Sequence, residues 1–202
     1  MYSIQFDYLF KRLLVLRKAL LPPKFSPTGN YKNQTYEKAR AYKVLTHAEF
    51  EYYFEEISYT IAKNAYNKWK DHNIASPPLL ALCVYYSGSY SPIPDRKDGN
   101  LSGEDINKRV KDAFTDYASR VKSKNHGIKE SNVLQLLLPI GLEASKLDND
   151  LLIALNNYSA SRGEIAHSTR AKQVLTPKDA MVSAMDLLHL IMPLDEYLNS
   201  MI

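Results

Sequence analysis

The amino-acid sequence predicts an all-α protein, a bundle of six to seven helices arranged around one long central helix. Apolar residues recur at three- and four-residue steps in most segments. No segment alternates apolar and polar residues as a half-buried strand does, and no internal repeat is present. The 202 residues suffice for one core, so we expect a single domain over 1–202, with an N-terminal helix and loop at 1–34 and the core at 35–202.

The first two predicted helices cover residues 4–21 and about 35–70, and a loop joins them at 22–34. Pro22-Pro23 ends the first helix, whereas the second contains neither Gly nor Pro. Two apolar stripes run along roughly opposite sides of the second helix: Ala41, Val44, Leu45, Ala48 and Tyr52, and Phe50, Tyr53, Phe54, Ile57 and Ile61. We therefore expect this helix to be central in the bundle or to lie between the core and a second subunit.

The remaining helices are predicted from their start signals and apolar faces. Ser76-Pro77-Pro78 opens a short buried helix that ends at Tyr86, and the longest loop follows at 87–101. A capping box at 102–105 opens the next helix, which fades near 125–127. A short apolar helix at 132–138 and a helix from about 148 come next. Thr176-Pro177 opens the last helix, whose Met residues at helical spacing indicate core packing.

Composition limits the classes of function. The formal net charge of +4 permits an acidic partner such as RNA without requiring one. A single cysteine, Cys83, excludes a disulfide within the chain and a zinc site built on cysteines, and we expect it to be a buried small hydrophobe. No apolar stretch approaches the roughly 20 residues of a membrane span, and no signal peptide is recognisable. We expect a cytoplasmic protein with no membrane contact.

Arg162 and His167 are the strongest candidates for chemistry. A guanidinium binds phosphate through a planar fork of donors, and an imidazole moves protons near neutral pH, so the pair could cleave a phosphodiester without a metal. On a regular helix the two side chains lie roughly 140° apart and ~7.5 Å apart along the axis. They meet only if the helix breaks near Gly163, if Arg162 wraps around, or if a second subunit contributes. Alternatively, Arg162 pairs with a carboxylate such as Glu164, and His167 bonds a carbonyl near a helix end.

Two further sets of polar residues are weaker candidates. The first is a polar stripe on the long helix: Arg40, Lys43, His47, Glu51 and Glu55. It is either a solvated face or, if it faces Arg162, a supporting set in which Glu51 orients the arginine and His47 holds a phosphate or the helix packing.

The second set is basic: Arg120, Lys122, Lys124, His126 and Lys129, with Arg170 after the Arg-His motif. These side chains either grip an RNA backbone or, at a helix C-terminus, complement the helix dipole. No His/Asp/Glu cluster with metal-ligand spacing, Gly-rich phosphate loop or nucleophile elbow is present, so metal-site, kinase, Rossmann and hydrolase readings lack support.

Two segments carry a resemblance to a known family: RAYKVLTHAEFE, from Arg40 to Glu51, and RGEIAHS, from Arg162 to Ser168. Together, in an all-helical context, they resemble the HEPN superfamily, and within it the RiboL-PSP-type HEPN proteins. The resemblance covers roughly residues 36–198. It implies a HEPN-like helical bundle that, in many members, is a metal-independent endoribonuclease and dimerises with the Arg-His motifs of two chains facing each other.

Carried over to this sequence, the resemblance implies that Arg162 binds the scissile phosphate and that His167 transfers protons while the RNA 2′-hydroxyl attacks phosphorus. The products would be a 2′,3′-cyclic phosphate and a 5′-hydroxyl, and the partner's His167 would be the acid. The implied partners are an RNA substrate and a second copy of the chain, with no cofactor and no metal. The implied role is a toxin or anti-phage defence effector that an antitoxin or other regulatory partner holds in check.

The sequence departs from the family pattern at two positions. The residue after the motif arginine is often polar, frequently Asn, and here it is Gly163, which removes a helper hydrogen bond. Some HEPN toxins carry a tyrosine two residues after the histidine that is modified to silence them, and here that position is Thr169. Gly163 favours the alternative of a non-catalytic helical module that binds RNA, a nucleotide or a protein. A third alternative is a structural adaptor in which Arg162 and His167 simply pack.

Overall fold

A computed structural model describes residues 1–86, 105–167 and 174–202, without the side chains of 164–167. Within those ranges the chain forms seven α-helices and two short 3₁₀ turns, and it contains no strand. The predicted all-α architecture is therefore confirmed. No helix in the described ranges combines the length and apolar character that a membrane crossing requires.

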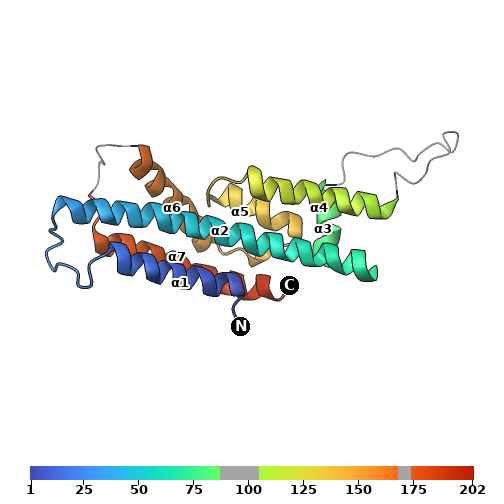
Figure 1. Ribbon diagram of the computed structural model, residues 1–202, viewed down its shortest axis with the longest axis horizontal. Coiled ribbons are helices and arrows are strands. Elements are labelled where there is room, and N and C mark those ends of the chain that lie inside the picture. The colour runs from blue at the N-terminus through green and yellow to red at the C-terminus, as the bar shows by residue number, and fades with distance from the viewer. Residues whose placement is uncertain (87–104, 168–173) are drawn as a thin grey trace.

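The longest helix, α2 (Asn33–His72), is the axis of the bundle (Figure 1). Its 40 residues correspond to about 60 Å of helix. It ends at Asn73, which adopts the left-handed conformation (φ 54°, ψ 32°), and the Asn73 N–H returns to the last-turn carbonyls. The prediction of one long central helix is confirmed, with two more residues at each end than the sequence indicated.

Two helices from the ends of the chain, α1 (Ile4–Leu20) and α7 (Pro177–Asn199), run along one side of α2 (Figure 1). The buried carboxylate of Asp195 joins all three helices, because it accepts hydrogen bonds from the Ser3 backbone N–H at 2.8 Å, the Ser3 hydroxyl and the Tyr53 hydroxyl at 2.8 Å. Ser3 is also the N-cap of α1. The two chain termini consequently lie near each other in Figure 1.

The rest of the chain covers the other side of α2 in two groups (Figure 1). One group consists of α3 (Pro77–Tyr86), α4 (Ile106–Ser123) and α5 (Glu130–Leu137). The other is α6 (Asn149–His167), which also packs on α7. The 3₁₀ turns η3 (Leu138–Ile140) and η4 (Ala144–Lys146) connect the two groups.

The two apolar stripes predicted on α2 have different environments. Phe50, Tyr53, Phe54, Ile57 and Ile61 are each at most 1 % exposed and form the centre of the core. The other stripe faces outward: Leu45 is 45 % exposed and Tyr52 is 47 % exposed. The opposite side of α2 therefore presents apolar surface that the rest of the described chain leaves open.

Most predicted helix starts are confirmed, with a few corrections. Thr176 caps α7 by accepting the Asp179 N–H, and α3 begins at Pro77. The N-cap of α4 is Asp105, and the predicted capping residues at 102–104, like the loop at 87–101, lie outside the described residues. Cys83 is only half-buried, because it packs at the edge of a small second cluster rather than in the main core.

Candidate functional site

The Arg-His motif lies in the last turns of α6, which remains helical through Gly163 to His167. Of the three alternatives, a break near Gly163 is therefore excluded: the glycine costs the helix nearly 1 kcal/mol relative to alanine, but that cost does not interrupt it. The His167 side chain lies outside the described part of the structure, as does Arg170.

Arg162 lies against the middle of α2, beside His47. Its charge is close enough to lower the pKa of His47. The Arg162 side chain is half-buried, and its Nε is buried without a hydrogen-bond partner among the described residues. A buried donor without a partner costs free energy, so this N–H is suited to an incoming acceptor. The alternative of a surface pair between Arg162 and Glu164 stays open, because the Glu164 side chain is not described.

His47 is buried, with 3 % of its surface exposed, and its ring stacks on that of Tyr158 at a centroid distance of 6.4 Å. Burial, together with the positive charges of Arg162 and Lys43, lowers the pKa of His47 to about 4. His47 is consequently a neutral imidazole at pH 7. Its Nδ1 lies 3.8 Å from Glu51 Oε2, too far for a direct hydrogen bond.

Lys43, one turn before His47, is also buried, at 2 % exposure. Its Nζ lies 3.1 Å from the centroid of the Tyr158 ring and donates a hydrogen bond to Ser183 Oγ at 3.0 Å. Burial lowers the pKa of Lys43 to about 7. The interpretation of the polar stripe as a solvated face is therefore wrong for Lys43 and His47, which point inward because α6 and α7 cover that side of α2.

Two pairs of residues four positions apart explain this arrangement. Lys43 and His47 share one face of α2, and Tyr158 and Arg162 share one face of α6. The Tyr158 hydroxyl and the Thr46 hydroxyl are 2.6 Å apart, and this contact fixes the two faces against each other. Sequence reasoning named Lys43 in the polar stripe but missed Tyr158 as a member of the site. The four-residue spacing of Tyr158 and Arg162 is the signal that could have found Tyr158.

Glu51 contacts the connection between α4 and α5, and its role in orienting Arg162 stays a prediction. Its Oε1 accepts the backbone N–H of Gly127 at 2.6 Å and so holds the connection between α4 and α5 against α2. Gly127 has φ of 118°, a conformation that side chains rarely adopt. Glu55, one turn later on α2, accepts a hydrogen bond from Asn125 Nδ2 at 2.9 Å in the same connection. Glu51 and Glu55 therefore act on the site by fixing the position of the connection between α4 and α5.

Arg40 continues the polar stripe toward the start of α2. Its Nη1 lies 3.7 Å from Glu37 Oε1, and the Arg40 side chain is 20 % exposed. It lies two helical turns before His47 on α2. We keep Arg40 as a candidate for contact with a phosphate next to the one that Arg162 would hold.

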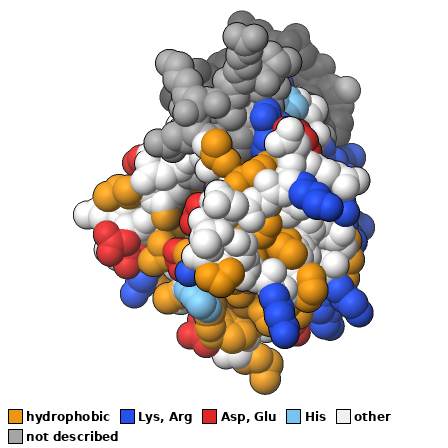
Figure 2. All heavy atoms as spheres, turned by 90° about the vertical axis from the view of Figure 1, so that its left-hand side faces the viewer, with side chains coloured by type: hydrophobic (Ala, Val, Ile, Leu, Met, Phe, Trp, Pro, Cys, Tyr) orange, Lys and Arg blue, Asp and Glu red, His pale blue; other side chains and the backbone are white. Residues whose placement is uncertain are grey.

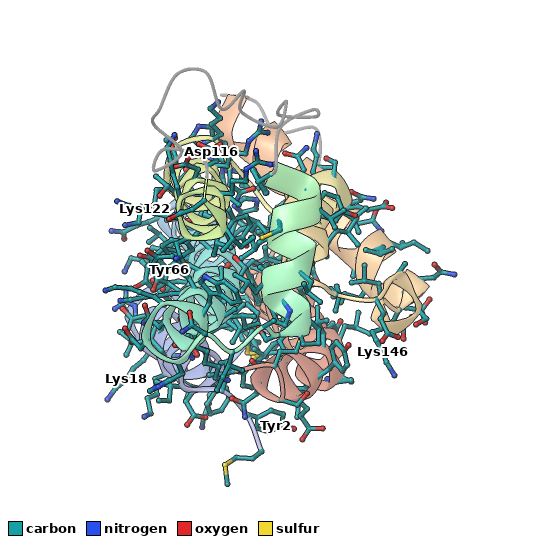
Figure 3. All side chains as sticks on the ribbon, turned by 90° about the vertical axis from the view of Figure 1, so that its right-hand side faces the viewer. Tyr2, Lys18, Tyr66, Asp116, Lys122 and Lys146 are labelled. Carbon is teal, nitrogen blue, oxygen red and sulfur yellow. The ribbon has the colours of Figure 1, made fainter. Side chains whose placement is uncertain are left out.

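The basic residues of α4 divide between two sides of the helix. Arg120 and Lys124 border a pocket against α3 and α5. Lys122 projects from the other side of α4 (Figure 3), where its Nζ lies 5.0 Å from the centroid of the Tyr59 ring. The end of the molecule at which the α1–α2 connection lies mixes apolar and basic side chains without one continuous basic patch (Figure 2).

The comparisons with known proteins give one match. The chain matches the family described as RiboL-PSP-HEPN over residues 14–199, which include both α2 and the Arg-His motif. No curated protein and no solved structure matches it. Because the match covers nearly the whole chain, the protein belongs to the RiboL-PSP-HEPN family and is a HEPN-type helical protein.

Proposed function

We propose that this protein is a metal-independent endoribonuclease in which Arg162 holds the scissile phosphate and His167 transfers protons. The observation that carries the proposal is the state of Arg162: a guanidinium at the end of α6 with a buried Nε that has no partner among the described residues. A phosphate oxygen is the acceptor that such a donor favours. Family membership supports the same assignment.

In the proposed reaction, the ribose 2′-oxygen bonds to the adjacent phosphorus while the bond from phosphorus to the 5′-oxygen breaks. A base takes the 2′-hydroxyl proton and an acid protonates the departing 5′-oxygen, which leaves a 2′,3′-cyclic phosphate and a 5′-hydroxyl. Arg162 stabilises the negative charge that grows on the phosphate oxygens. One imidazole cannot be base and acid in the same step, so two copies of His167 divide these roles in a homodimer.

The homodimer is proposed from family membership, because many HEPN proteins dimerise with the Arg-His motifs of two chains facing each other. Its interface has to lie on the side of the bundle that carries Arg162. The outward stripe of α2, with Leu45 and Tyr52, lies on the opposite side from Lys43 and His47 and is not that interface. Light scattering should show a dimer, and a monomer that still cleaves RNA would contradict the division of roles between two copies of His167.

His47 and Lys43 are proposed as positioning residues for Arg162. Because the pKa of His47 is lowered to about 4, His47 adds no competing positive charge beside the guanidinium at pH 7. The rings of His47 and Tyr158 stack, and Lys43 packs on the Tyr158 ring. The three side chains therefore form a rigid surface on one side of Arg162. Limiting solvent on one side strengthens the interaction of the guanidinium with a phosphate.

We propose a biological role as a toxin or anti-phage defence effector in the cytoplasm, with an antitoxin or other regulatory partner. Uncontrolled cleavage of RNA is harmful to the cell that makes the enzyme, so such an activity requires restraint. Single-stranded RNA or an exposed loop is the expected substrate, because in-line attack by the 2′-hydroxyl needs a flexible backbone.

A second candidate function is a non-catalytic module that binds RNA, a nucleotide or a protein. Gly163 favours it, because glycine lacks the polar side chain that often follows the motif arginine in this family. The half-buried position of Arg162 against α2 is also compatible with binding alone.

The two candidates differ in a simple experiment: total RNA is incubated in EDTA with the wild-type protein, Arg162→Ala or His167→Ala. The matched controls are Arg12→Ala, whose guanidinium pairs with Glu49 on another face, and His189→Ala, an exposed histidine on α7. Cleavage by the wild type and both controls, lost in both motif variants, supports the nuclease. RNA binding that Arg162→Ala loses and His167→Ala keeps, with no cleavage by any protein, supports the module.

A further inference from the structure

A pocket in the described part of the chain lies away from Arg162, between α3, α4 and α5. Its volume is about 320 Å³, at the lower end of the range for sites that bind small molecules. Its wall includes three tyrosines, two basic residues and two carboxamides: Tyr85, Tyr86, Tyr117, Arg120, Lys124, Asn125 and Gln135. Among the described residues that line it, two are basic and none is acidic, so this part of the pocket favours an anionic ligand.

The aromatic part of the pocket is held in place by its own contacts. Tyr117 is fully buried, and its hydroxyl donates to the Leu136 carbonyl at 2.8 Å. Tyr86 meets the Tyr117 ring edge-on at 5.7 Å between centroids. Tyr85 lies at the rim with 56 % of its surface exposed, so its ring is accessible to a flat ligand. A planar aromatic group can therefore enter between the rim and the fixed floor.

The basic part lies along one side of the same opening. Arg120 lies in the last turn of α4, Lys124 is the C-cap residue that follows the helix, and both line the pocket. The Arg120 guanidinium lies 5.5 Å from the centroid of the Tyr86 ring. The Asp116 carboxylate lies near enough to interact electrostatically with the Tyr86 hydroxyl, but Asp116 does not line the pocket. The pocket therefore combines a stacking surface with two cations at a short distance from it.

Base stacking on tyrosine and phosphate contacts from Arg and Lys are the combination by which proteins bind single nucleotides in a strand. We infer that the pocket bounded by Tyr85, Arg120 and Lys124 binds one nucleotide unit, its base against Tyr85 and its phosphate on the two cations. The carboxamide of Gln135 adds both a donor and an acceptor for the edge of the base. The nucleotide comes either from an RNA strand or from a free nucleotide.

When the nucleotide comes from an RNA strand, the inference rests on the proposed function and extends it by a second subsite. Asn125 lines the pocket and bonds to Glu55, while Gly127, two residues later, bonds to Glu51 beside His47. The connection between α4 and α5 thus links the pocket to the surroundings of Arg162. Binding of a free nucleotide instead makes this connection a route for regulation and does not require nuclease activity.

The test measures binding in the Arg162→Ala/His167→Ala double variant, so that failure of cleavage and failure of this pocket are separate results. The probes are a labelled eight-nucleotide RNA, followed by fluorescence anisotropy, and AMP and ATP, followed by calorimetry. Tyr85→Ala and Arg120→Ala should each weaken binding about tenfold, as loss of one stacked base or one phosphate contact does. Tyr85→Phe keeps the ring and should retain the affinity.

Lys122→Ala is the matched control, since Lys122 carries the same charge on the same helix but points away from the pocket (Figure 3). It should change the affinity less than twofold. RNA binding without AMP or ATP binding identifies a strand subsite, and binding of the free nucleotides identifies a regulatory site. Absence of binding by every probe, or equal losses in Lys122→Ala and Arg120→Ala with none in Tyr85→Ala, would overturn the inference.

Discussion

Lys43→Met is expected to abolish a pH dependence of stability that the wild-type protein carries between pH 7 and pH 9. Burial lowers the pKa of Lys43 to about 7 in the folded protein, against 10.5 for an exposed lysine. Above pH 7 the unfolded chain therefore binds more protons than the folded one, and the free energy of unfolding rises with pH. Below pH 7 both states carry the proton, so the dependence on pH ends and the folded protein carries the full cost of the buried charge.

The expected magnitude follows from the proton counts. At pH 7 about half of the folded molecules carry the Lys43 proton and by pH 9 about one in a hundred do, whereas the unfolded chain retains it throughout. A full difference of one proton is worth about 1.4 kcal/mol per pH unit, so the wild type gains about 2 kcal/mol between pH 7 and pH 9. His47 does not contribute in this window, since its pKa of about 4 and its ordinary value both lie below pH 7.

Urea unfolding of the wild type and Lys43→Met at pH 7, 8 and 9 measures the effect, with Trp69 fluorescence and circular dichroism as probes. The free energy of unfolding of the wild type minus that of Lys43→Met should rise by about 2 kcal/mol from pH 7 to pH 9. Lys43 Nζ lies 3.1 Å from the centroid of the Tyr158 ring, and this contact favours the charged amine. The contact therefore acts against the lowering of the Lys43 pKa. A difference that stays constant with pH would show that the ring holds Lys43 protonated and would refute the reasoning.

Three further substitutions test the packing around the site, each by urea unfolding. Asp195→Asn should destabilise the protein by about 2–3 kcal/mol, because the amide cannot accept the three hydrogen bonds from Ser3 and Tyr53; an unchanged midpoint would contradict this role. Tyr158→Phe should cost about 1 kcal/mol through the lost contact with Thr46, and a larger loss would mean that the ring itself has moved. Gly127→Ala should cost about 1–3 kcal/mol because of the φ of 118°, and a stabilised variant would contradict the assigned backbone conformation.

The sequence predicted the helices well where local signals determine them. Pro22-Pro23 and Thr176-Pro177 mark helix boundaries through backbone chemistry that depends on few neighbours. The absence of Gly and Pro from 35–70 likewise predicted the long helix, which extends over Asn33–His72. Whether the helix breaks at Gly163 was left open by the sequence, since a single glycine weakens a helix without being able to end it alone.

The environment of the polar stripe could not be predicted from local pattern. A lysine and a histidine four residues apart on a helix usually indicate a solvated face, but here α6 and α7 cover them. Only tertiary packing brings Tyr158 and Ser183 to Lys43. The division of Arg120 and Lys122 between two sides of α4 follows from the helical repeat, whereas the pocket beside Arg120 depends on α3 and α5.

The most direct test of the central proposal uses a short labelled RNA of defined sequence in EDTA, with analysis of the product ends. The wild type should leave a 2′,3′-cyclic phosphate and a 5′-hydroxyl. A single 2′-deoxy nucleotide at the cleaved position should block the reaction, because the attacking hydroxyl is then missing. Arg162→Ala and His167→Ala should each abolish cleavage. Cutting of the 2′-deoxy substrate, or cleavage that survives either substitution, would contradict the proposal that these two residues direct a 2′-hydroxyl attack.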